Sequence, residues 1–147
     1  MTATYTDLKN KRIFITGGGS GIGASIVEHF CEQKSEVYFV DINKKESIKL
    51  LKKLKNKKIK KPMFLECSVT DTKKLQKLIK EIILSKGPID VLVNNAANDD
   101  RHSTYDVSEE YWQDRIDINL KHYFFAAQAV IAGMMKKKNG SIINLSS

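Results

Sequence analysis

The segment Thr-Gly-Gly-Gly-Ser-Gly-Ile-Gly at residues 16–23 constrains the fold more than any other part of this chain. It follows directly on the apolar run Ile-Phe-Ile, and apolar residues at helical spacing come after it. A strand that turns through glycines into a helix is typical of a site for the pyrophosphate of a dinucleotide. Gly17 permits the sharp turn, Gly21 leaves room for phosphate oxygens, and Gly23 lets the helix pack on the strand. The helix N-terminus adds unpaired N–H groups and a partial positive charge.

A second short apolar run, residues 36–41, ends in a carboxylate 18 residues beyond Gly23. A carboxylate at such a strand end can accept hydrogen bonds from the adenosine ribose hydroxyls, and it repels a 2′-phosphate. Asp41 therefore favours NAD over NADP. Lys44 and Lys45 follow closely and could soften that preference. An ordinary aspartate at a turn is the plain alternative.

Strand and helix patterns alternate along the whole chain. The apolar runs predict strands at residues 12–16, 36–41, 62–66, 89–94 and 141–145. Helices are expected at residues 21–34, 44–57, 72–86 and, with a break or bend, 108–137. Repeated strand–helix units predict an α/β fold of the Rossmann type, a doubly wound parallel sheet with helices on both faces. Ligands bind at the carboxyl ends of the strands in such sheets. The length of 147 residues suits a single domain, residues 1–147.

The composition bears on partners and location. The net charge is +8, but only three of the 25 basic residues are arginine, the residue preferred for base and phosphate contacts. A dense lysine run at residues 44–61 contains leucines at helical spacing and no aromatic residues for stacking, which favours a solvated helix face over a nucleic-acid site. Cys31 and Cys67 suggest neither a disulfide framework nor a metal site. The longest apolar stretch, residues 124–135, is too short to span a bilayer. With no signal-peptide pattern at the N-terminus, we expect a cytoplasmic protein without nucleic-acid or membrane partners.

Together the motifs resemble the N-terminal part of the short-chain dehydrogenase/reductase family. Beside the glycine segment, Asn-Asn-Ala-Ala at residues 94–97 is similar to that family's Asn-Asn-Ala-Gly motif after the fourth strand. Asp-Ile-Asn-Leu at residues 117–120 resembles the segment that carries its structural and catalytic asparagine. Residues 142–147 resemble the fifth strand, whose second serine is catalytic. The resemblance implies an oxidoreductase that transfers hydride between a hydroxyl or carbonyl substrate and NAD.

The same resemblance assigns roles to individual residues. Ser147 would hydrogen-bond the reacting oxygen, and Asn119 would order a proton relay. Two positions depart from the family pattern: Ser68 stands where an aspartate commonly contacts the adenine, and Ala97 replaces the last glycine of the Asn-Asn-Ala-Gly motif. The cofactor-binding residues expected from the glycine segment and the resemblance are Thr16, Gly17, Gly19, Ser20, Gly21, Ile22, Gly23, Asp41, Ser68, Val69, Asn95, Ala96 and Ala97.

Three segments suggest a narrower group within the family. Residues 98–102, Tyr111-Trp112 and residues 119–122 look like the bacterial NAD-dependent sugar 1-dehydrogenases of the D-xylose type, which oxidise an aldose at its anomeric carbon. The polar loop at residues 98–102 would suit a polyhydroxylated substrate, since a buried site must pair each sugar hydroxyl. A solvated loop with a local ion pair is the alternative. Homo-oligomers are also implied by the resemblance.

The family's chemistry also needs a Tyr-x-x-x-Lys pair on a helix after the serine strand. The chain contains this pattern only at residues 5–9, ahead of the first strand, where it is a coincidence. We therefore expect a Rossmann domain truncated after its fifth strand, which binds NAD but is inactive alone. A 3-oxoacyl-type reductase is one alternative, although it would normally use NADPH, which Asp41 disfavours. A non-catalytic NAD-binding module is another.

Overall fold

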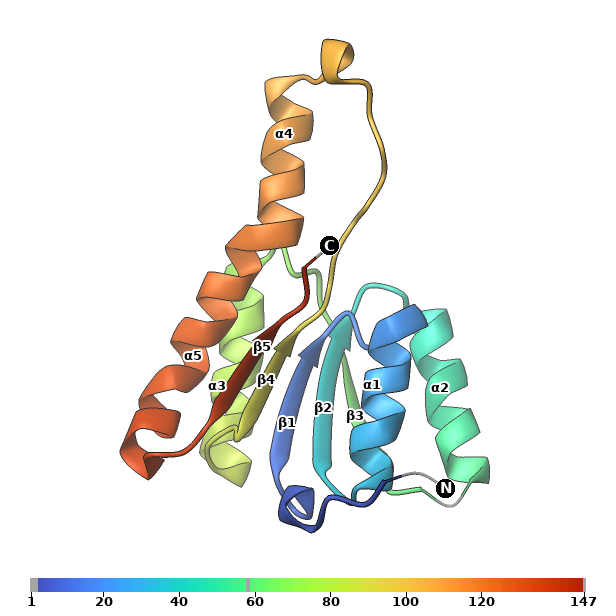
Figure 1. Cartoon of the computed structure of the whole chain (residues 1–147), viewed down its shortest axis with the longest axis vertical. Helices are drawn as coiled ribbons and strands as arrows, with labels where there is room; N and C mark the ends of the chain where they lie inside the picture. Colours follow the sequence, from blue (N-terminus) through green and yellow to red (C-terminus); the bar gives the residue numbers. More distant parts are fainter. Residues whose placement is uncertain (1–2, 58, 147) are drawn as a thin grey trace.

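The computed structural model describes residues 3–57 and 59–146. In these residues, strands form one parallel sheet in the order β3-β2-β1-β4-β5. The strands are β1 Arg12–Thr16, β2 Glu36–Asp41, β3 Met63–Glu66, β4 Val91–Asn94 and β5 Ser141–Asn144. The strand order reverses beside β1, so β1 and β4 are neighbours in the sheet. Their carboxyl ends lie next to each other, and from these ends the chain continues in opposite directions. This is the predicted α/β Rossmann-type sheet, and the prediction is confirmed (Figure 1).

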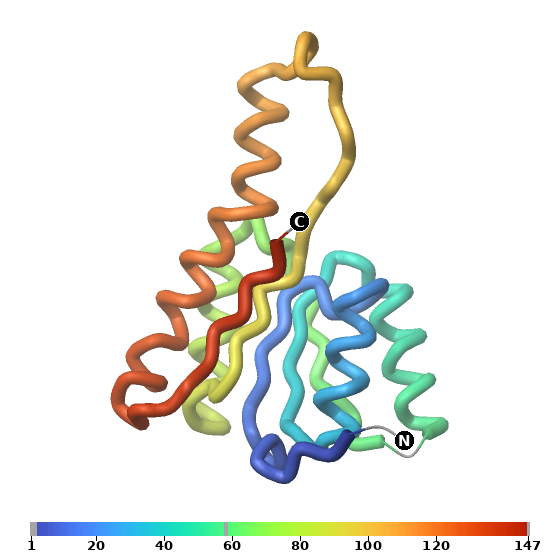
Figure 2. Tube along the Cα trace, in the orientation of Figure 1, coloured from blue at the N-terminus to red at the C-terminus, as the bar shows by residue number. Residues whose placement is uncertain are grey.

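Helices cover both faces of the sheet. They are α1 Gly21–Glu32, α2 Lys44–Asn56, α3 Thr72–Lys86, α4 Glu109–Ile116 and α5 His122–Lys137. α1 and α2 pack on one face, and α3 and α5 pack on the other (Figure 1). The loop after β4 and α4 project beyond the carboxyl ends of the strands (Figure 2). No helix within the described ranges has both the length and the apolar character needed to cross a membrane.

Each face of the sheet has its own apolar layer. On one face, Phe14 and Leu92 pack with α3 and α5 residues such as Ile79 and Val130. On the other face, Ile13, Ile15 and Phe39 pack with α1 and α2. Burial on both faces explains why β1 and β2 read as continuous apolar runs in the sequence. The two layers fix the positions of the strands, and the loops of the site begin at the ends of these strands.

The expected helix at residues 108–137 has its break at a π-helical turn, Asp117–Lys121, between α4 and α5. Ser108 caps α4 as expected, because its side chain accepts a hydrogen bond from the N–H of Tyr111. β4 begins at Val91 rather than at residue 89, since Asp90 turns its carboxylate to the N–H of Arg12 and to Lys137. π-helical turns are frequent at functional sites.

Several apolar side chains of the outer elements are exposed. Ile142 and Ile143 lie on β5, which is an edge strand of this sheet. On α5, Phe124 is 65% exposed, whereas Val130 is fully buried against the sheet. One side of α5 therefore belongs to the core, and the other faces outward.

A buried carboxylate joins α1 to α2. Glu28 of α1 is 8% exposed, and its two oxygens pair with Lys53 and Lys57 of α2. The hydrogen bonds from these lysines hold the pKa of Glu28 below its ordinary value. Part of the lysine run in the sequence thus serves to fasten α2 against α1.

We expect Glu28→Gln to lower the free energy of unfolding by about 1–2 kcal/mol, because both charged hydrogen bonds are weakened at once. Urea unfolding followed by circular dichroism measures this change. Glu81→Gln is the matched control, since Glu81 pairs with Lys77 on an exposed surface of α3 at 4.0 Å. The control should change stability by no more than ~0.5 kcal/mol. Equal effects of the two substitutions would contradict the role of Glu28.

Candidate functional site

The glycine-rich turn lies between the carboxyl end of β1 and the start of α1. Gly17 and Gly21 have positive φ angles of 67° and 52°, a region that favours glycine. A Cβ at Gly23 would overlap the carbonyl oxygen of Gly17, so α1 approaches the strand end only because this residue has no side chain. A Cβ at Gly21 would meet no atom within 4 Å, since this glycine faces open space. The turn therefore presents bare backbone at the edge of the sheet.

The N-terminus of α1 lacks the side-chain cap that α2, α3 and α4 have. Ser20 occupies the N-cap position, but its side chain makes no capping hydrogen bond. In α2, α3 and α4 the N-cap side chains of Asn43, Asp71 and Ser108 each accept one. α1 therefore directs uncapped N–H groups and the positive end of its dipole at the turn, an arrangement that suits a phosphate.

Asp41 ends β2 beside this turn. Its Oδ2 accepts a hydrogen bond from the N–H of Gly19 at 2.8 Å, and its Oδ1 accepts one from the N–H of Asn43 at 2.7 Å. A carboxylate oxygen can accept more than one hydrogen bond. The Asp41 carboxylate is thus fixed in position and can still accept hydrogen bonds from the hydroxyl groups of a ligand.

Beneath the turn, the fully buried side chain of Thr16 joins three parts of the fold. Its Oγ1 accepts hydrogen bonds from the N–H groups of Asn95 at 3.0 Å and Ala96 at 3.1 Å. The same oxygen lies 3.2 Å from Nε2 of His122, which is also fully buried. This hydroxyl links the end of β1 to the loop after β4 and to the start of α5.

Asn95 fastens the loop after β4 to the glycine turn a second time. Its Nδ2 donates to the carbonyl oxygens of Thr16 at 3.0 Å and Gly17 at 2.9 Å. The side chain therefore satisfies backbone carbonyls at the point where β1 ends. As a result, residues 95–97 lie directly beside the glycine turn.

These segments surround a cleft of about 670 Å³ at the carboxyl ends of the strands. Most of the expected cofactor-binding residues line it: Gly17, Ser20, Gly21, Ile22, Gly23, Asp41, Ser68, Val69, Asn95, Ala96 and Ala97. Thr16 and Gly19 do not line it. Thr16 lies below the cleft, and the N–H of Gly19 is bonded to Asp41. The structure thus brings together in one cavity residues that are far apart in the sequence.

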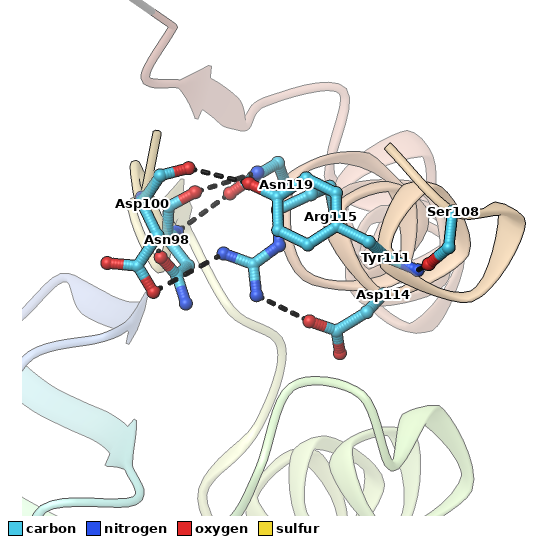
Figure 3. A network of polar contacts seen from close by, with 7 residues as sticks. All are labelled: Asn98, Asp100, Ser108, Tyr111, Asp114, Arg115 and Asn119. Atoms are coloured by element: carbon cyan, nitrogen blue, oxygen red, sulfur yellow. Dashed lines mark hydrogen bonds and ion pairs between the residues drawn. The ribbon is translucent and has the colours of Figure 1, made fainter. Parts of the chain in front are cut away.

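The π-helical turn carries Asn119, one of the two expected catalytic residues. Its Oδ1 accepts from the N–H of Asn98 at 2.8 Å, and its Nδ2 donates to the carbonyl of Asn98 at 3.0 Å (Figure 3). Asn119 does not line the cleft, but Asn98 and Ile118 do. Ser147, the other expected catalytic residue, lies outside the described residues.

Two side chains of α4 hold the loop after β4 further out. The hydroxyl of Tyr111 donates to the carbonyl of Asp100 at 2.7 Å, and its ring lies 5.0 Å from the guanidinium carbon of Arg115. Arg115 pairs with Asp114 and lies 3.8 Å from the Asp100 carboxylate (Figure 3). The expected ion pair of this loop is present, but it joins Asp100 to Arg115 of α4 rather than to a residue of the loop itself. Asp99, the neighbouring carboxylate, lines the cleft.

Burial raises the pKa of two titratable groups in this part of the fold. Cys67 lines the cleft, and burial raises the pKa of its thiol. Burial also raises the pKa of Tyr123, whose hydroxyl donates to the carbonyl of Leu145 at 2.7 Å. Cys31 and Cys67 are both free thiols, and no group of His, Cys, Asp or Glu in residues 3–57 and 59–146 is arranged to hold a metal ion.

Some residues of the cleft escaped the sequence analysis. Asn43 could have been found as a helix N-cap directly after β2. Ile118 could not, because its place depends on how the π-helical turn packs against that loop. The other lining residues that were missed are Ile42, Cys67 and Thr70, whereas Asn98 and Asp99 belong to the polar loop at residues 98–102 that the sequence analysis singled out for a substrate.

The chain matches the short chain dehydrogenase family over residues 11–147. It belongs to the short-chain dehydrogenases. It is 44% identical over 146 residues to a D-xylose 1-dehydrogenase of Caulobacter vibrioides, covering 99% of this chain and 57% of that relative. The ligand-free aldohexose dehydrogenase of Thermoplasma acidophilum superposes with a TM-score of 0.83 at 31% identity, covering 97% of this chain and 51% of that one. A gluconate 5-dehydrogenase of Burkholderia cenocepacia, in complex with NADP and tartrate, has a TM-score of 0.82 at 27% identity, with 95% and 54% covered.

The chain described here spans just over half the length of each of these relatives. The family's fold binds a nicotinamide dinucleotide, and the cleft described above fits such a group. The bare backbone at Gly21 leaves space that a side chain would fill, and the uncapped N-terminus of α1 can hold a pyrophosphate. The carboxylate of Asp41 lies beside this turn, bonded to the N–H of Gly19.

The burial of His122 predicts that the free energy of unfolding of the chain depends on pH. Burial lowers its pKa from 6.5 to about 4, against the opposing effect of the bond to the Ile118 carbonyl. Between these values the unfolded chain takes up a proton that the folded chain does not, so the free energy of unfolding falls as the pH drops. The expected loss between pH 6.5 and pH 4 is about 3 kcal/mol.

Denaturant unfolding of the wild type and of His122→Gln across this pH range tests the prediction. The difference between the two proteins removes the contribution of the carboxylates, which both share. The free energy of unfolding of the wild type, taken relative to that of His122→Gln, should fall progressively as the pH is lowered. Stability curves that stay parallel from pH 6.5 to pH 4 would contradict the assignment.

Proposed function

We propose that this chain is the cofactor-binding part of an NAD-dependent dehydrogenase whose substrate is an aldose sugar. The observation that carries the proposal is the cleft itself, in which a bare glycine turn, an uncapped helix N-terminus and the Asp41 carboxylate lie together. When bound, NAD accepts a hydride from the carbinol carbon of the substrate. The residues described here bind and orient that cofactor.

Each side of the cleft has a distinct task in this proposal. The N-terminus of α1 and Ser20 hold the pyrophosphate, and Asp41 accepts hydrogen bonds from the adenosine ribose. Ser68 and Val69, which follow β3, lie on the adenine side. The hydroxyl of Ser68 is already bonded to that of Thr70 at 2.8 Å, and serine lacks the charge of the family's usual aspartate. The adenine contact is therefore weaker here or is made by the backbone. Residues 95–97 line the wall that leads toward the nicotinamide.

The surroundings of Asp41 support NAD rather than NADP. A 2′-phosphate would have to approach the carboxylate, and a nearby cation would be needed to offset the repulsion. Lys44 is the nearest candidate in the sequence, but its ammonium pairs with Glu66 at 3.4 Å. Lys45 is exposed on α2. The carboxylate therefore dominates this part of the cleft.

The substrate side supports a polyhydroxylated ligand. Asp99 and Asn98 line the cleft from the loop after β4, and both offer polar atoms for hydroxyl groups. The relatives named as D-xylose and aldohexose dehydrogenases point to the same substrate class. Ser147 would hydrogen-bond the reacting oxygen, and Asn119 would hold the relay beside it.

Replacing Asp41 with Asn should shift the cofactor preference. The amide keeps the size of the side chain but loses the charge that repels a 2′-phosphate, so the ratio of NADP to NAD affinity should rise roughly tenfold. Isothermal titration of the chain with NAD and with NADP measures both affinities. Asp7→Asn, on an exposed turn before β1, is the control and should leave the ratio unchanged. A wild-type chain that binds NADP more tightly than NAD would refute the preference.

The aldose assignment has its own test. We expect the reading frame to continue beyond Ser147 into a Tyr-x-x-x-Lys pair, and the encoded protein to reduce NAD with D-xylose or D-galactose. A 3-hydroxyacyl thioester serves as the comparison substrate, because a 3-oxoacyl-type reductase would act on it in the reverse direction. Absorbance of NADH at saturating NAD gives the rates. Faster turnover of the thioester, or binding of NAD with no turnover of any alcohol, would replace the aldose proposal with one of its alternatives.

A further inference from the structure

His122 is a buried, polar residue for which the proposed chemistry has no use. It is 0% exposed at the first position of α5, directly after the π-helical turn. An apolar side chain could fill the same space without the cost of burying two ring nitrogens. Both nitrogens, however, are bonded: Nδ1 lies 2.7 Å from the carbonyl of Ile118, and Nε2 lies 3.2 Å from the hydroxyl of Thr16.

The hydrogen-bond partners determine the tautomer of this ring. The carbonyl of Ile118 can only accept, so Nδ1 must carry the proton. In the neutral ring Nε2 is then an acceptor, and the hydroxyl of Thr16 donates to it. With its proton directed at His122, Thr16 is left with two lone pairs, and these receive the N–H groups of Asn95 and Ala96. Each donor and acceptor of the His122 ring and of the Thr16 hydroxyl is thus used once.

We propose that His122 is a positioning residue, which orients the Thr16 hydroxyl so that the loop after β4 is held in the geometry that binds the dinucleotide. This inference rests on the proposed function of the same cleft. The ring acts on the cofactor only through its hydrogen-bond partners, because His122 does not line the cleft. Thr16 is the partner that reaches Asn95 and Ala96, which do line it.

The other nitrogen extends the effect to the second wall of the cleft. Ile118 lines the cleft and belongs to the π-helical turn, and its carbonyl receives the Nδ1–H of His122. Asn119 follows it and is bonded to the backbone of Asn98 in both directions. One imidazole ring therefore ties the loop after β4 and the turn that carries Asn119 to the same strand end.

Two substitutions separate the two nitrogens. His122→Gln places an acceptor near the position of Nε2, so it can keep the bond from Thr16 while losing the Ile118 contact. His122→Asn places a donor near Nδ1, so it can keep the Ile118 contact while losing the acceptor. Thr16→Val removes the hydroxyl but keeps the shape of the side chain. We expect the Kd for NAD to rise about tenfold in His122→Asn and Thr16→Val and no more than about threefold in His122→Gln.

The double variant Thr16→Val/His122→Asn gives the decisive comparison. If the two residues act through one hydrogen bond, the Kd of the double variant for NAD should equal the Kd of the single variant that binds NAD more weakly. Multiplication of the two effects, or equal weakening in His122→Gln and His122→Asn, would mean that His122 only fills space, and the proposal would be overturned. The melting temperature of each variant accompanies the Kd, so that a loss of folding is not mistaken for a loss of positioning.

A spectroscopic measurement on the wild-type chain needs neither a variant nor a cofactor. The ¹⁵N shifts of the His122 ring at pH 7 should show a protonated Nδ1 and an Nε2 that accepts a hydrogen bond. The amide signals of Asn95 and Ala96 should shift in His122→Asn and stay in place in His122→Gln. An Nε2-protonated ring would refute the proposal even if NAD binds. Failure of the wild type to bind NAD would refute the proposed function and leave this measurement to decide the role of His122.

Discussion

The geometry of the cleft depends on the meeting of β1 and β4 at the centre of the sheet. Their parallel register pairs Ile15 with Val93, so both strands end at the same level. Thr16 then accepts two N–H groups from the loop after β4, while Asn95 donates back to the carbonyls of the glycine turn. In a buried setting each of these groups would be costly to leave unpaired. The two loops that form the cleft are therefore held in one relative position.

Local sequence patterns were sufficient to predict the elements of the sheet. The bounds of β1, β2 and α3 agree with the sequence pattern, because Gly17 follows β1, the carboxylate of Asp41 ends β2, and Gly87 follows α3. Most residues expected to bind the cofactor line the cleft, because the carboxyl ends of parallel strands must converge. Whether each of them contacts a dinucleotide stays a prediction, as does the role of Ser147.

Contacts between distant residues explain what the sequence did not predict. Thr16 was expected at the cofactor, but its hydroxyl faces His122, a partner 106 positions later in the chain. The loop at residues 98–102 was expected to hold a substrate or an internal ion pair, yet Arg115 of α4 reaches Asp100. The two contacts come from residues on either side of the π-helical turn, Arg115 in α4 and His122 at the start of α5. No propensity of the residues involved indicates such a turn.

The two sides of the cleft are held by interactions of different range. On the side that the proposed function assigns to the adenosine, Asp41 is bonded to Gly19 and Asn43, which lie near it in the sequence or in the adjacent turn. On the other side, Asn98 depends on Asn119, and Asp100 depends on Tyr111 and Arg115, all carried by the projecting helix and its π-helical turn (Figure 3). Changes in α4 can therefore reshape the substrate side while the adenosine side stays intact. This separation explains how one cofactor-binding scaffold can serve different substrates.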